Sequence, residues 1–547
     1  MTYKLKRIMK KYKLQWFITA QLLFWLMHIP LISLWCEIRQ RYDAVLQIPR
    51  DTLELLWRLA FETAWTAALV YCVMQTRYNE ATDGRNFMRD KLRYERSYDD
   101  LMRYYRDADK SRLDTSKLKY ESWKDVDGIP LGTVDGKLIK RGTDDKGNLM
   151  VFGLPGFGKT TGAISTAALR FGATVSERFA GFDHNIAETA GSTVVIDIKG
   201  DILHWTKGRR RIKIFDPEDP DSCHFDPFRG IREMTLSARR VFIEGMAEIL
   251  VQEEEGGKYF TDGGRDFFSG IALYMLHENI NTSFMQVVDS ILHGNGFDWV
   301  TRIVEGDCDE AKDFLASYYG SNEKNVAGCY NSVSKALRKF KSGALPSILN
   351  GDGECISVGM LDDGWDLYIE VPQDKISLYS SVTTLLIQQL MNAFMQRPDS
   401  SSGVHNRPVL FILDEMPKLR FDFDTLENCL STMRSKSVTC MMAAQSIGQY
   451  KKRYGEQAFV NLVDCCQYIC CLSALEPSSR KWFSDLIGTR KVLKRSTSSG
   501  ASSGSVSVQE VREPVLQPEQ FSQLDDKCVI YIVGQGYVIA DKCNVYD

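Results

Sequence analysis

Hydrophobic positions divide the chain into three kinds of sequence. Two long apolar segments come first, at residues 14–36 and 53–75. From about residue 128, short apolar runs alternate with stretches of helical period, whereas residues 231–345 carry the helical period alone. Apolar strands separated by helices form parallel sheets that are covered on both faces. The pattern therefore predicts an α/β fold with a mostly parallel sheet, an all-α insertion and two N-terminal transmembrane helices.

The strands of this sheet are expected where an apolar run ends in polar or small residues. The runs are NLMVFGL (148–154), STVVIDIKGD (192–201), RIKIFDP (211–217), WDLYIEVP (365–372), PVLFILDEMPKL (408–419) and VTCMMAAQS (438–446). Residues 496–508 are rich in Ser and Gly, which predicts a mobile loop. The last 20 residues predict a hairpin at an edge of the sheet.

The first apolar segment has the properties of a membrane span. Residues 14–36 contain no Asp, Glu, Lys or Arg, and Trp16 and Trp35 lie near the two ends. At about 1.5 Å per residue, a helix of this length crosses a hydrocarbon core of roughly 30 Å. Interfacial tryptophans are typical of such spans.

The second segment, 53–75, is less apolar because it contains Glu54, Arg58 and Glu62. An amphipathic helix on the membrane surface is the alternative interpretation. Basic residues are denser in 1–13 and 76–96 than in the short linker between the segments. The positive-inside rule then puts both flanks in the cytoplasm, which favours two spans.

Composition narrows the possible classes of protein. The chain has 547 residues and a net charge of -3, which excludes a strongly basic DNA-binding protein but not a local basic channel. Fourteen cysteines are present, and the one cluster, CCQYICC from Cys465, lacks the spacing of a zinc site. We expect these thiols to be buried and reduced, as in the cytosol. The seven histidines form no HxxxH pair, which excludes a zinc hydrolase of that type.

A glycine-rich stretch follows the first predicted strand and opens a helix. The residues Gly153-x4-Gly158-Lys159-Thr160 match the phosphate-binding loop pattern in the required strand–helix context. Backbone N–H groups of such a loop surround a β-phosphate, and the lysine reaches the β- and γ-oxygens. The expected ligand is ATP with Mg²⁺, and Thr160 is a predicted Mg²⁺ ligand. The predicted cofactor-binding residues are Gly153, Leu154, Pro155, Gly156, Phe157, Gly158, Lys159, Thr160 and Thr161.

Two carboxylates complete this predicted site. Asp414 and Glu415 follow the apolar run VLFIL, where a strand of the sheet is expected to end. We expect Asp414 to hold the Mg²⁺ and Glu415 to act as general base toward the attacking water. The only metal implied is Mg²⁺.

Three further residues have predicted roles. Gln445 ends the run CMMAA, and in a strand beside that of Asp414 its amide would face the γ-phosphate. Arg434 is a candidate arginine finger for a neighbouring subunit, with Lys436 as a nearby competitor. Asp197 either lies near the nucleotide or caps the turn that follows its strand; the residues leave both alternatives open.

Four stretches carry a resemblance to a known family. They are GLPGFGKTTG, VVIDIKGD, FILDEMPKL and AAQSIGQYKKRYG, and together with the anchor and the insertion they resemble the type IV coupling proteins, the TraG/TraD-like ATPases. Asp201 stands where that family has Glu in its DxKGE-type segment. The resemblance implies a RecA-like motor core, a homo-hexamer with a central channel, and the finger and sensor roles for Arg434 and Gln445. The implied catalytic set is thus Lys159, Asp414, Glu415, Arg434 and Gln445.

The hydrophobic pattern and this resemblance together predict the domain organisation. They predict a membrane anchor (1–76), a juxtamembrane linker (77–127), a RecA-like nucleotide-binding domain (128–230 and 346–547) and an all-α insertion domain (231–345).

The function implied by the resemblance is delivery of a macromolecule to a type IV secretion or conjugation channel at the cost of ATP. The implied partners are a relaxase with single-stranded DNA or secreted effector proteins, the channel components and the membrane. The implied location is the bacterial inner membrane, multi-pass, with the ATPase domain in the cytoplasm. Two alternatives stay open, namely a nucleotide-switched substrate receptor without motor activity and an FtsK-like pump for double-stranded DNA.

Overall fold

The structure is a computed structural model that describes residues 112–173, 189–252, 257–400, 405–499 and 504–546. The chain divides into two compact units, Met1–Arg106 and Asp107–Asp547, and every described residue belongs to the second unit. Both predicted transmembrane segments lie outside the described residues. Within the described ranges, no helix is both long enough and apolar enough to cross a bilayer.

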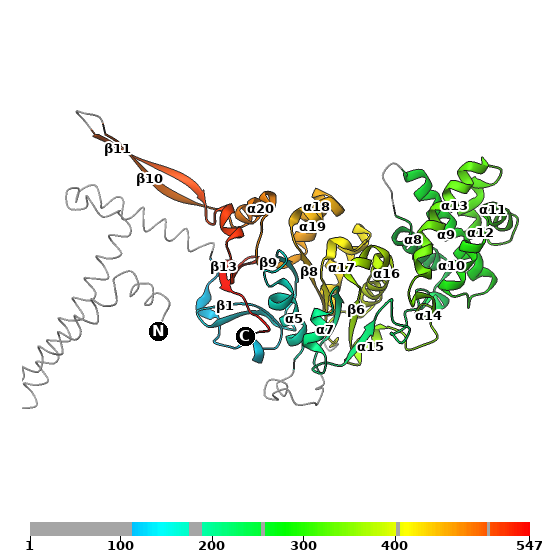
Figure 1. Cartoon of the computed structure of the whole chain (residues 1–547), viewed down its shortest axis with the longest axis horizontal. Helices are drawn as coiled ribbons and strands as arrows, with labels where there is room; N and C mark the ends of the chain where they lie inside the picture. The colour runs from blue at the N-terminus through cyan, green and yellow to red at the C-terminus, as the bar shows by residue number, and fades with distance from the viewer. Residues whose placement is uncertain (1–111, 174–188, 253–256, 401–404, 500–503, 547) are drawn as a thin grey trace, which may run out of the picture. The chain divides into compact units, whose positions relative to one another are not determined.

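The core of the fold is a sheet of 11 strands in the order β2-β1-β13-β12-β9-β3-β8-β7-β4-β6-β5 (Figure 1). The strands are β1 Ile129–Val134, β2 Lys137–Arg141, β3 Asn148–Phe152, β4 Ser192–Asp197, β5 Ile212–Phe215, β6 Asp366–Glu370, β7 Val409–Leu413, β8 Val438–Ala444, β9 Cys466–Cys471, β12 Lys527–Ile532 and β13 Gly536–Asp541. All six strands predicted from the apolar runs are present.

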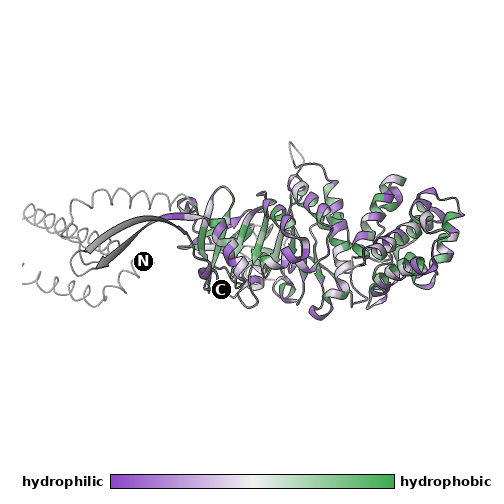
Figure 2. Cartoon of the chain, turned by 90° about the horizontal axis from the view of Figure 1, so that it is seen from above, coloured by the Kyte–Doolittle hydropathy of each residue, from purple (hydrophilic) through white to green (hydrophobic). Residues whose placement is uncertain are grey.

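The strands from β9 to β5 are parallel to one another, as predicted. Every residue of β3, β4, β7 and β8 is buried, which is why their sequences read as continuous apolar runs rather than alternating ones. Figure 2 shows apolar colour concentrated along these strands, whereas the helices carry both colours. The covering elements are η4 Lys159–Ile164, α5 Ser165–Arg170, α7 Asp201–Thr206, η8 Gln373–Lys375, α16 Ile376–Met395, η9 Met416–Lys418, α17 Phe423–Thr432, η10 Met433–Lys436, α18 Ile447–Tyr454, α19 Glu456–Asp464, α20 Pro477–Ile487 and η11 Pro518–Ser522.

The remaining strands extend the sheet with antiparallel pairs. β12 and β13 form the hairpin that the sequence predicts, but its predicted position at an edge is wrong. β12 pairs with β9 and β13 pairs with β1, so the hairpin lies inside the sheet. The edge strand on this side of the sheet is β2. It forms a hairpin with β1 that we did not predict from the sequence. Two short turns precede it, η2 Thr115–Lys117 and η3 Trp123–Asp125.

In the described part of the Ser- and Gly-rich stretch, residues 496–499 and 504–508 lie in strands rather than in the loop that we predicted. β10 Thr489–Ser499 pairs antiparallel with β11 Gly504–Pro514 along their whole length, from Thr489↔Pro514 to Ser499↔Gly504. Serine and glycine have low strand propensity. The pairing runs without a break from the charged and β-branched residues at the Thr489 end into the Ser-rich end at Ser499. This unbroken register extends the strands into the Ser- and Gly-rich stretch.

Helices alone connect β5 to β6 in the described residues, and α8 to α13 gather into one group in Figure 1. They are η5 Ile231–Glu233, α8 Leu236–Leu250, α9 Lys258–Glu278, α10 Phe284–His293, α11 Gly296–Val304, α12 Asp309–Leu315, η6 Ala316–Tyr318, α13 Glu323–Leu337, η7 Arg338–Lys341, α14 Leu345–Ile348 and α15 Val358–Asp362. Side-chain caps mark the starts of α8, α10, α11, α13 and α15, and Ser283 and Gln286 form a reciprocal capping box on α10. One hydrophobic cluster runs from Phe152 of β3 to Phe284 of α10. The division into separate domains therefore stays a prediction.

Candidate nucleotide-binding and hydrolysis site

The glycine loop connects β3 to η4 and takes a conformation that requires glycine. Gly156 and Gly158 have φ of 83° and 81°, in the left-handed region that side chains disfavour. Two neighbouring strands hold the start of the loop. The N–H of Gly153 donates to the carbonyl of Ala444 at 3.1 Å, and the N–H of Leu154 donates to Ser473 Oγ at 2.9 Å. The turn thus opens between the ends of β8 and β9.

Lys159 meets both predicted carboxylates. Its Nζ lies 2.7 Å from Asp414 Oδ1 and 2.6 Å from Glu415 Oε1, and all three side chains are buried. Burial opposes the charge of Lys159, but Asp414 and Glu415 outweigh it and raise the pKa of the amine above its ordinary value. Burial likewise raises the pKa of Glu415, but Lys159 outweighs this and leaves that pKa below its ordinary value. The site thus holds one cation and one carboxylate firmly charged.

Glu415 lies at a special backbone position. Its φ is 52°, in the left-handed region that non-glycine residues seldom adopt. Its own N–H donates to Asp414 Oδ1 at 2.9 Å. Oε2 is buried and accepts no hydrogen bond from the described residues; the nearest cation, Lys418 Nζ, is 3.7 Å away. One carboxylate oxygen is therefore free to accept a proton from a ligand or a water.

Gln445 lies where the sequence predicts it. β7 and β8 are adjacent and parallel, with Leu413 opposite Met442. Gln445 Nε2 donates to Glu415 Oε1 at 3.2 Å, and its backbone N–H donates to Gln449 Oε1 at 3.1 Å. Its side-chain amide thus contacts the general-base candidate, and its backbone N–H contacts the first turn of α18.

Arg434 does not belong to this group within its own chain. It lies in η10, which precedes β8, whereas Gln445 follows that strand. Seven strand residues at ~3.3 Å each separate the two by about 23 Å. Lys436, the competing residue, is held by Asp399 at 2.9 Å, whereas Arg434 is exposed. The structure therefore places Arg434 and Gln445 at opposite ends of β8.

Asp197 caps the turn before α7. Its carboxylate accepts from the N–H of Leu203 at 2.7 Å and from that of Lys199 at 3.3 Å. Burial raises the pKa of this carboxyl, and the backbone donors oppose that effect. Of the two roles left open by the sequence, capping is the one that the contacts support.

The donor set at the site fits ATP with Mg²⁺. Carboxylate and hydroxyl oxygens are the ligands that Mg²⁺ prefers, and Thr160 and Asp414 supply one of each. The loop offers backbone N–H groups, Lys159 offers a cation, and Glu415 Oε2 lacks a partner in the described residues. These are the groups that a triphosphate and an attacking water require.

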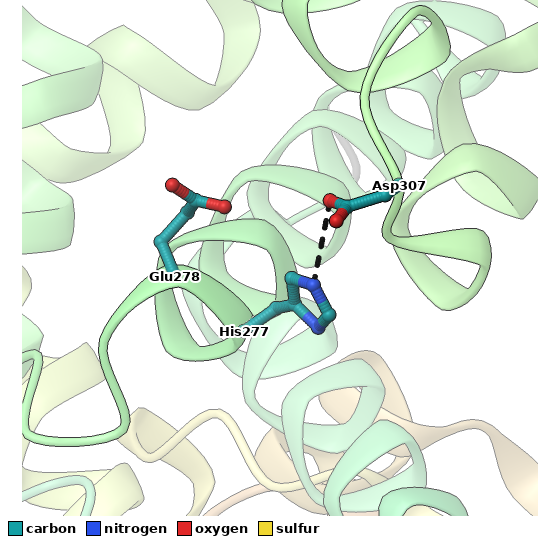
Figure 3. A group of neighbouring side chains, drawn as sticks. All are labelled: His277, Glu278 and Asp307. Carbon is teal, nitrogen blue, oxygen red and sulfur yellow. Dashed lines mark ion pairs between the residues drawn. The ribbon is translucent and has the colours of Figure 1, made fainter.

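A second group of possible metal ligands lies far from this site in sequence. His277, Glu278 and Asp307 bring ligand atoms within 4.8 Å of one another, and His277 Nε2 is 3.5 Å from Asp307 (Figure 3). All three side chains are exposed. Exposed ligands at this spacing form a surface ion pair rather than a built metal site.

Two residues near the site were not predicted from the sequence. Ser473 follows β9 and holds Leu154, and Lys542 follows β13 and donates from Nζ to the carbonyl of Phe157 at 3.0 Å. For Ser473 a signal exists, because it is the first polar residue after the apolar run YICCL. For Lys542 no local pattern distinguishes it from other surface lysines.

A strand, a glycine loop and a helix beside a strand that ends in two carboxylates define the class of P-loop nucleotide-binding proteins. A family model described as "Type IV secretory system Conjugative DNA transfer" matches residues 184–547. The match covers more than half of the chain, and the protein belongs to this family.

Curated relatives agree with this family. The chain is 25% identical over 243 residues to the conjugal transfer protein TraG of Rhizobium radiobacter, covering 43% of this chain and 37% of that protein. It is 22% identical over 374 residues to VirD4 of Rhizobium rhizogenes, covering 65% and 54%. It is 20% identical over 349 residues to the type IV secretion system-coupling protein VirD4 of Bartonella quintana, covering 60% and 53%. The chain thus spans about half or less of the length of these relatives.

Solved structures show the same fold. The bacterial conjugative coupling protein TrwBdeltaN70, in an unbound form, matches with a TM-score of 0.54 and 18% identity, over 76% of this chain and 89% of that one. TrwB in complex with ADP and Mg²⁺ matches with a TM-score of 0.54 and 16% identity over the same shares. At these identities the likeness establishes the fold alone.

Proposed function

We propose that this protein is a membrane-anchored coupling ATPase that delivers macromolecules to a type IV secretion or conjugation channel. The observation that carries the proposal is the contact of Lys159 with both Asp414 and Glu415 at the end of the glycine loop. Family membership supplies the context of conjugative DNA transfer. A related fold has been solved with ADP and Mg²⁺ and with an ATP analogue, which supports ATP and Mg²⁺ as the ligands here.

The chemistry follows from the positions of the side chains. The loop N–H groups and Lys159 bind the phosphate oxygens, so Lys159 exchanges its carboxylate partners for phosphate. Thr160 and Asp414 would hold a Mg²⁺, which neutralises charge on the phosphates. Glu415 takes a proton from the attacking water through Oε2, the oxygen without a hydrogen-bond partner in the described residues.

Gln445 and Arg434 act at the two ends of β8. Gln445 holds Glu415 through Oε1 and orients the water, and its second contact to Gln449 carries the change at the phosphate into α18. Arg434 reaches the γ-phosphate bound by the next subunit of a homo-hexamer. Its exposure and its position at the end of β8 opposite to Gln445 support a role in trans.

The remaining assignments complete the proposal. Residues 14–36 and 53–75 anchor the protein in the bacterial inner membrane as a multi-pass protein with the ATPase in the cytoplasm, and 77–127 link the anchor to a nucleotide-binding domain of 128–230 and 346–547. The all-α insertion, 231–345, receives the cargo. The cargo is a relaxase with single-stranded DNA or a secreted effector protein, as relatives named for conjugal transfer and type IV secretion suggest.

The test of the nucleotide site uses the full chain in detergent. ATP binding and phosphate release are measured for the wild type, Lys159→Ala and Glu415→Gln. We expect hydrolysis in the wild type, a loss of both binding and hydrolysis in Lys159→Ala, and retained binding with hydrolysis lowered at least about 100-fold in Glu415→Gln. Hydrolysis in Glu415→Gln at the wild-type rate would show that another group is the base.

A further inference from the structure

The segment Lys542–Tyr546, which follows β13, runs along the glycine loop. At one end, Lys542 Nζ donates to the carbonyl of Phe157 at 3.0 Å and to that of Asp525 at 2.5 Å. At the other end, the N–H of Val545 donates to the carbonyl of Thr161 at 3.1 Å. The segment is therefore fastened to both sides of the turn that begins η4.

The helix after the loop is built to receive this segment. η4 is a π-helical turn in which the N–H of Ser165 donates to the carbonyl of Thr160, so the carbonyl of Thr161 is available to Val545. A Cβ at Gly162 would lie 2.8 Å from the carbonyl oxygen of Cys543, so only glycine permits this approach. Single π-turns inside helices occur frequently at functional sites.

The orientation of a bound nucleotide follows from the residues that contact its γ-phosphate. Lys159, Asp414 and Glu415 define the γ-phosphate end. Among the described contacts, the 542–546 segment touches neither carboxylate; it touches Phe157 and Thr161 instead. A nucleotide whose phosphates follow the loop toward Lys159 therefore directs its nucleoside toward this segment.

Tyr546 offers an aromatic surface at that place. Tyr546 is 73% exposed and directly follows Val545, whose N–H is bonded to the carbonyl of Thr161. The ring meets Trp205 of α7 edge to face, with centroids 5.1 Å apart and planes at 89°. Trp205 thus contacts the Tyr546 ring on one side, and most of the surface of Tyr546 stays exposed.

We propose that the 542–546 segment is the nucleoside subsite, with Tyr546 stacking on the base and Lys542 binding the ribose–α-phosphate end. The inference rests on the proposed ATP site and adds to it the residues that select a nucleoside triphosphate over a bare polyphosphate. Lys542 is half-buried beside the loop, so a small rotation of its amine exchanges the carbonyl of Phe157 for a ligand oxygen.

The test compares two ligands that share the phosphates and differ in the nucleoside. Affinities of the full chain in detergent for Mg·ATP and for Mg·tripolyphosphate are measured by calorimetry for the wild type, Tyr546→Ala and Tyr546→Phe. Tyr120→Ala is the matched control, because Tyr120 is similarly exposed at 75% but lies beside Gly136 and Lys137, outside the site.

Tyr546→Ala should weaken ATP binding about tenfold, the scale of one base–aromatic stack, and leave tripolyphosphate binding unchanged. Tyr546→Phe and Tyr120→Ala should match the wild type. Unchanged ATP affinity in Tyr546→Ala, or an equal loss for both ligands, would overturn the subsite while leaving the ATP site intact. A wild-type protein that binds neither ligand would overturn the ATP site and the subsite together.

Discussion

At the scale of single residues, Glu415 combines a chemical role with an unusual backbone. A non-glycine residue with φ of 52° costs of order 1–3 kcal/mol unless its surroundings impose it. Here Lys159 and Gln445 hold Oε1, and the N–H of Glu415 is bonded to Asp414. This conformation leaves Oε2 free of hydrogen-bond partners in the described chain. The backbone of this turn thus orients the Glu415 carboxylate that we propose as the general base.

Gln445 gives the prediction at this scale. Gln445→Ala removes the donor to Glu415 Oε1, so the carboxylate loses one of the contacts that orient it. We expect kcat for ATP to fall about tenfold with little change in KM, because the amide contacts the base rather than the loop. Steady-state phosphate release measures both constants. Gln457→Ala, at an exposed position of α19, is the control, and an equal fall in both variants would contradict the role.

The sequence predicted the residues whose neighbours are apolar strands. Asp414, Glu415 and Gln445 directly follow such strands, and Lys159 follows the glycine loop after β3. Parallel strands bring those ends to one edge of the sheet. Lys542 could not be found in this way, because its contact with Phe157 joins segments 385 residues apart. Asp197 caps a turn because it accepts from the backbone N–H of Leu203, six residues further on. The sequence pattern does not show this contact, so it left the role of Asp197 undecided.

At the scale of elements, the fully buried strands were the most predictable part. Their continuous apolar runs identify them because both faces are covered. The order of the strands in the sheet was harder to predict from the sequence. The β12–β13 hairpin looked like an edge because its next neighbour, β1, is some 400 residues earlier in the chain. The β10–β11 ribbon was missed because its pairing overrides the low strand propensity of Ser and Gly.

A buried ion pair joins the outer parallel strands. Arg210, just before β5, is paired with Asp366, the first residue of β6, and both side chains are almost fully buried. Asp366 Oδ1 also accepts from the N–H of Thr193 in β4 at 2.6 Å. The pair therefore fixes the start of three strands, including the one beside β7.

Asp366→Ala should destabilise the protein strongly, because it leaves the Arg210 cation buried without its carboxylate. We expect a loss of about 3–5 kcal/mol in the free energy of unfolding, measured by denaturant titration. Glu354→Ala is the matched control on the same edge, because Glu354 is exposed in its pair with Lys213 of β5. That variant should lose about 1 kcal/mol or less. Equal losses in the two variants would contradict a structural role for the buried pair.

At the scale of the whole molecule, we propose that another copy of the chain completes the site. The chain supplies the loop, the two carboxylates and Gln445 at one edge of the sheet, and Arg434 at the opposite end of β8. The sequence predicted Arg434 as a finger, but whether it acts depends on assembly, which no pattern within one chain determines. The predicted membrane segments lie outside the described residues and stay predictions.

The most direct measurement is the ATPase rate per subunit of the full chain as protein concentration rises, with and without single-stranded DNA. We predict a rate that increases with concentration, is stimulated by DNA, and loses its dependence on concentration in Arg434→Ala while ATP binding is kept. A rate per subunit that is independent of concentration and of DNA, and equal in Arg434→Ala, would contradict an oligomeric DNA-dependent motor.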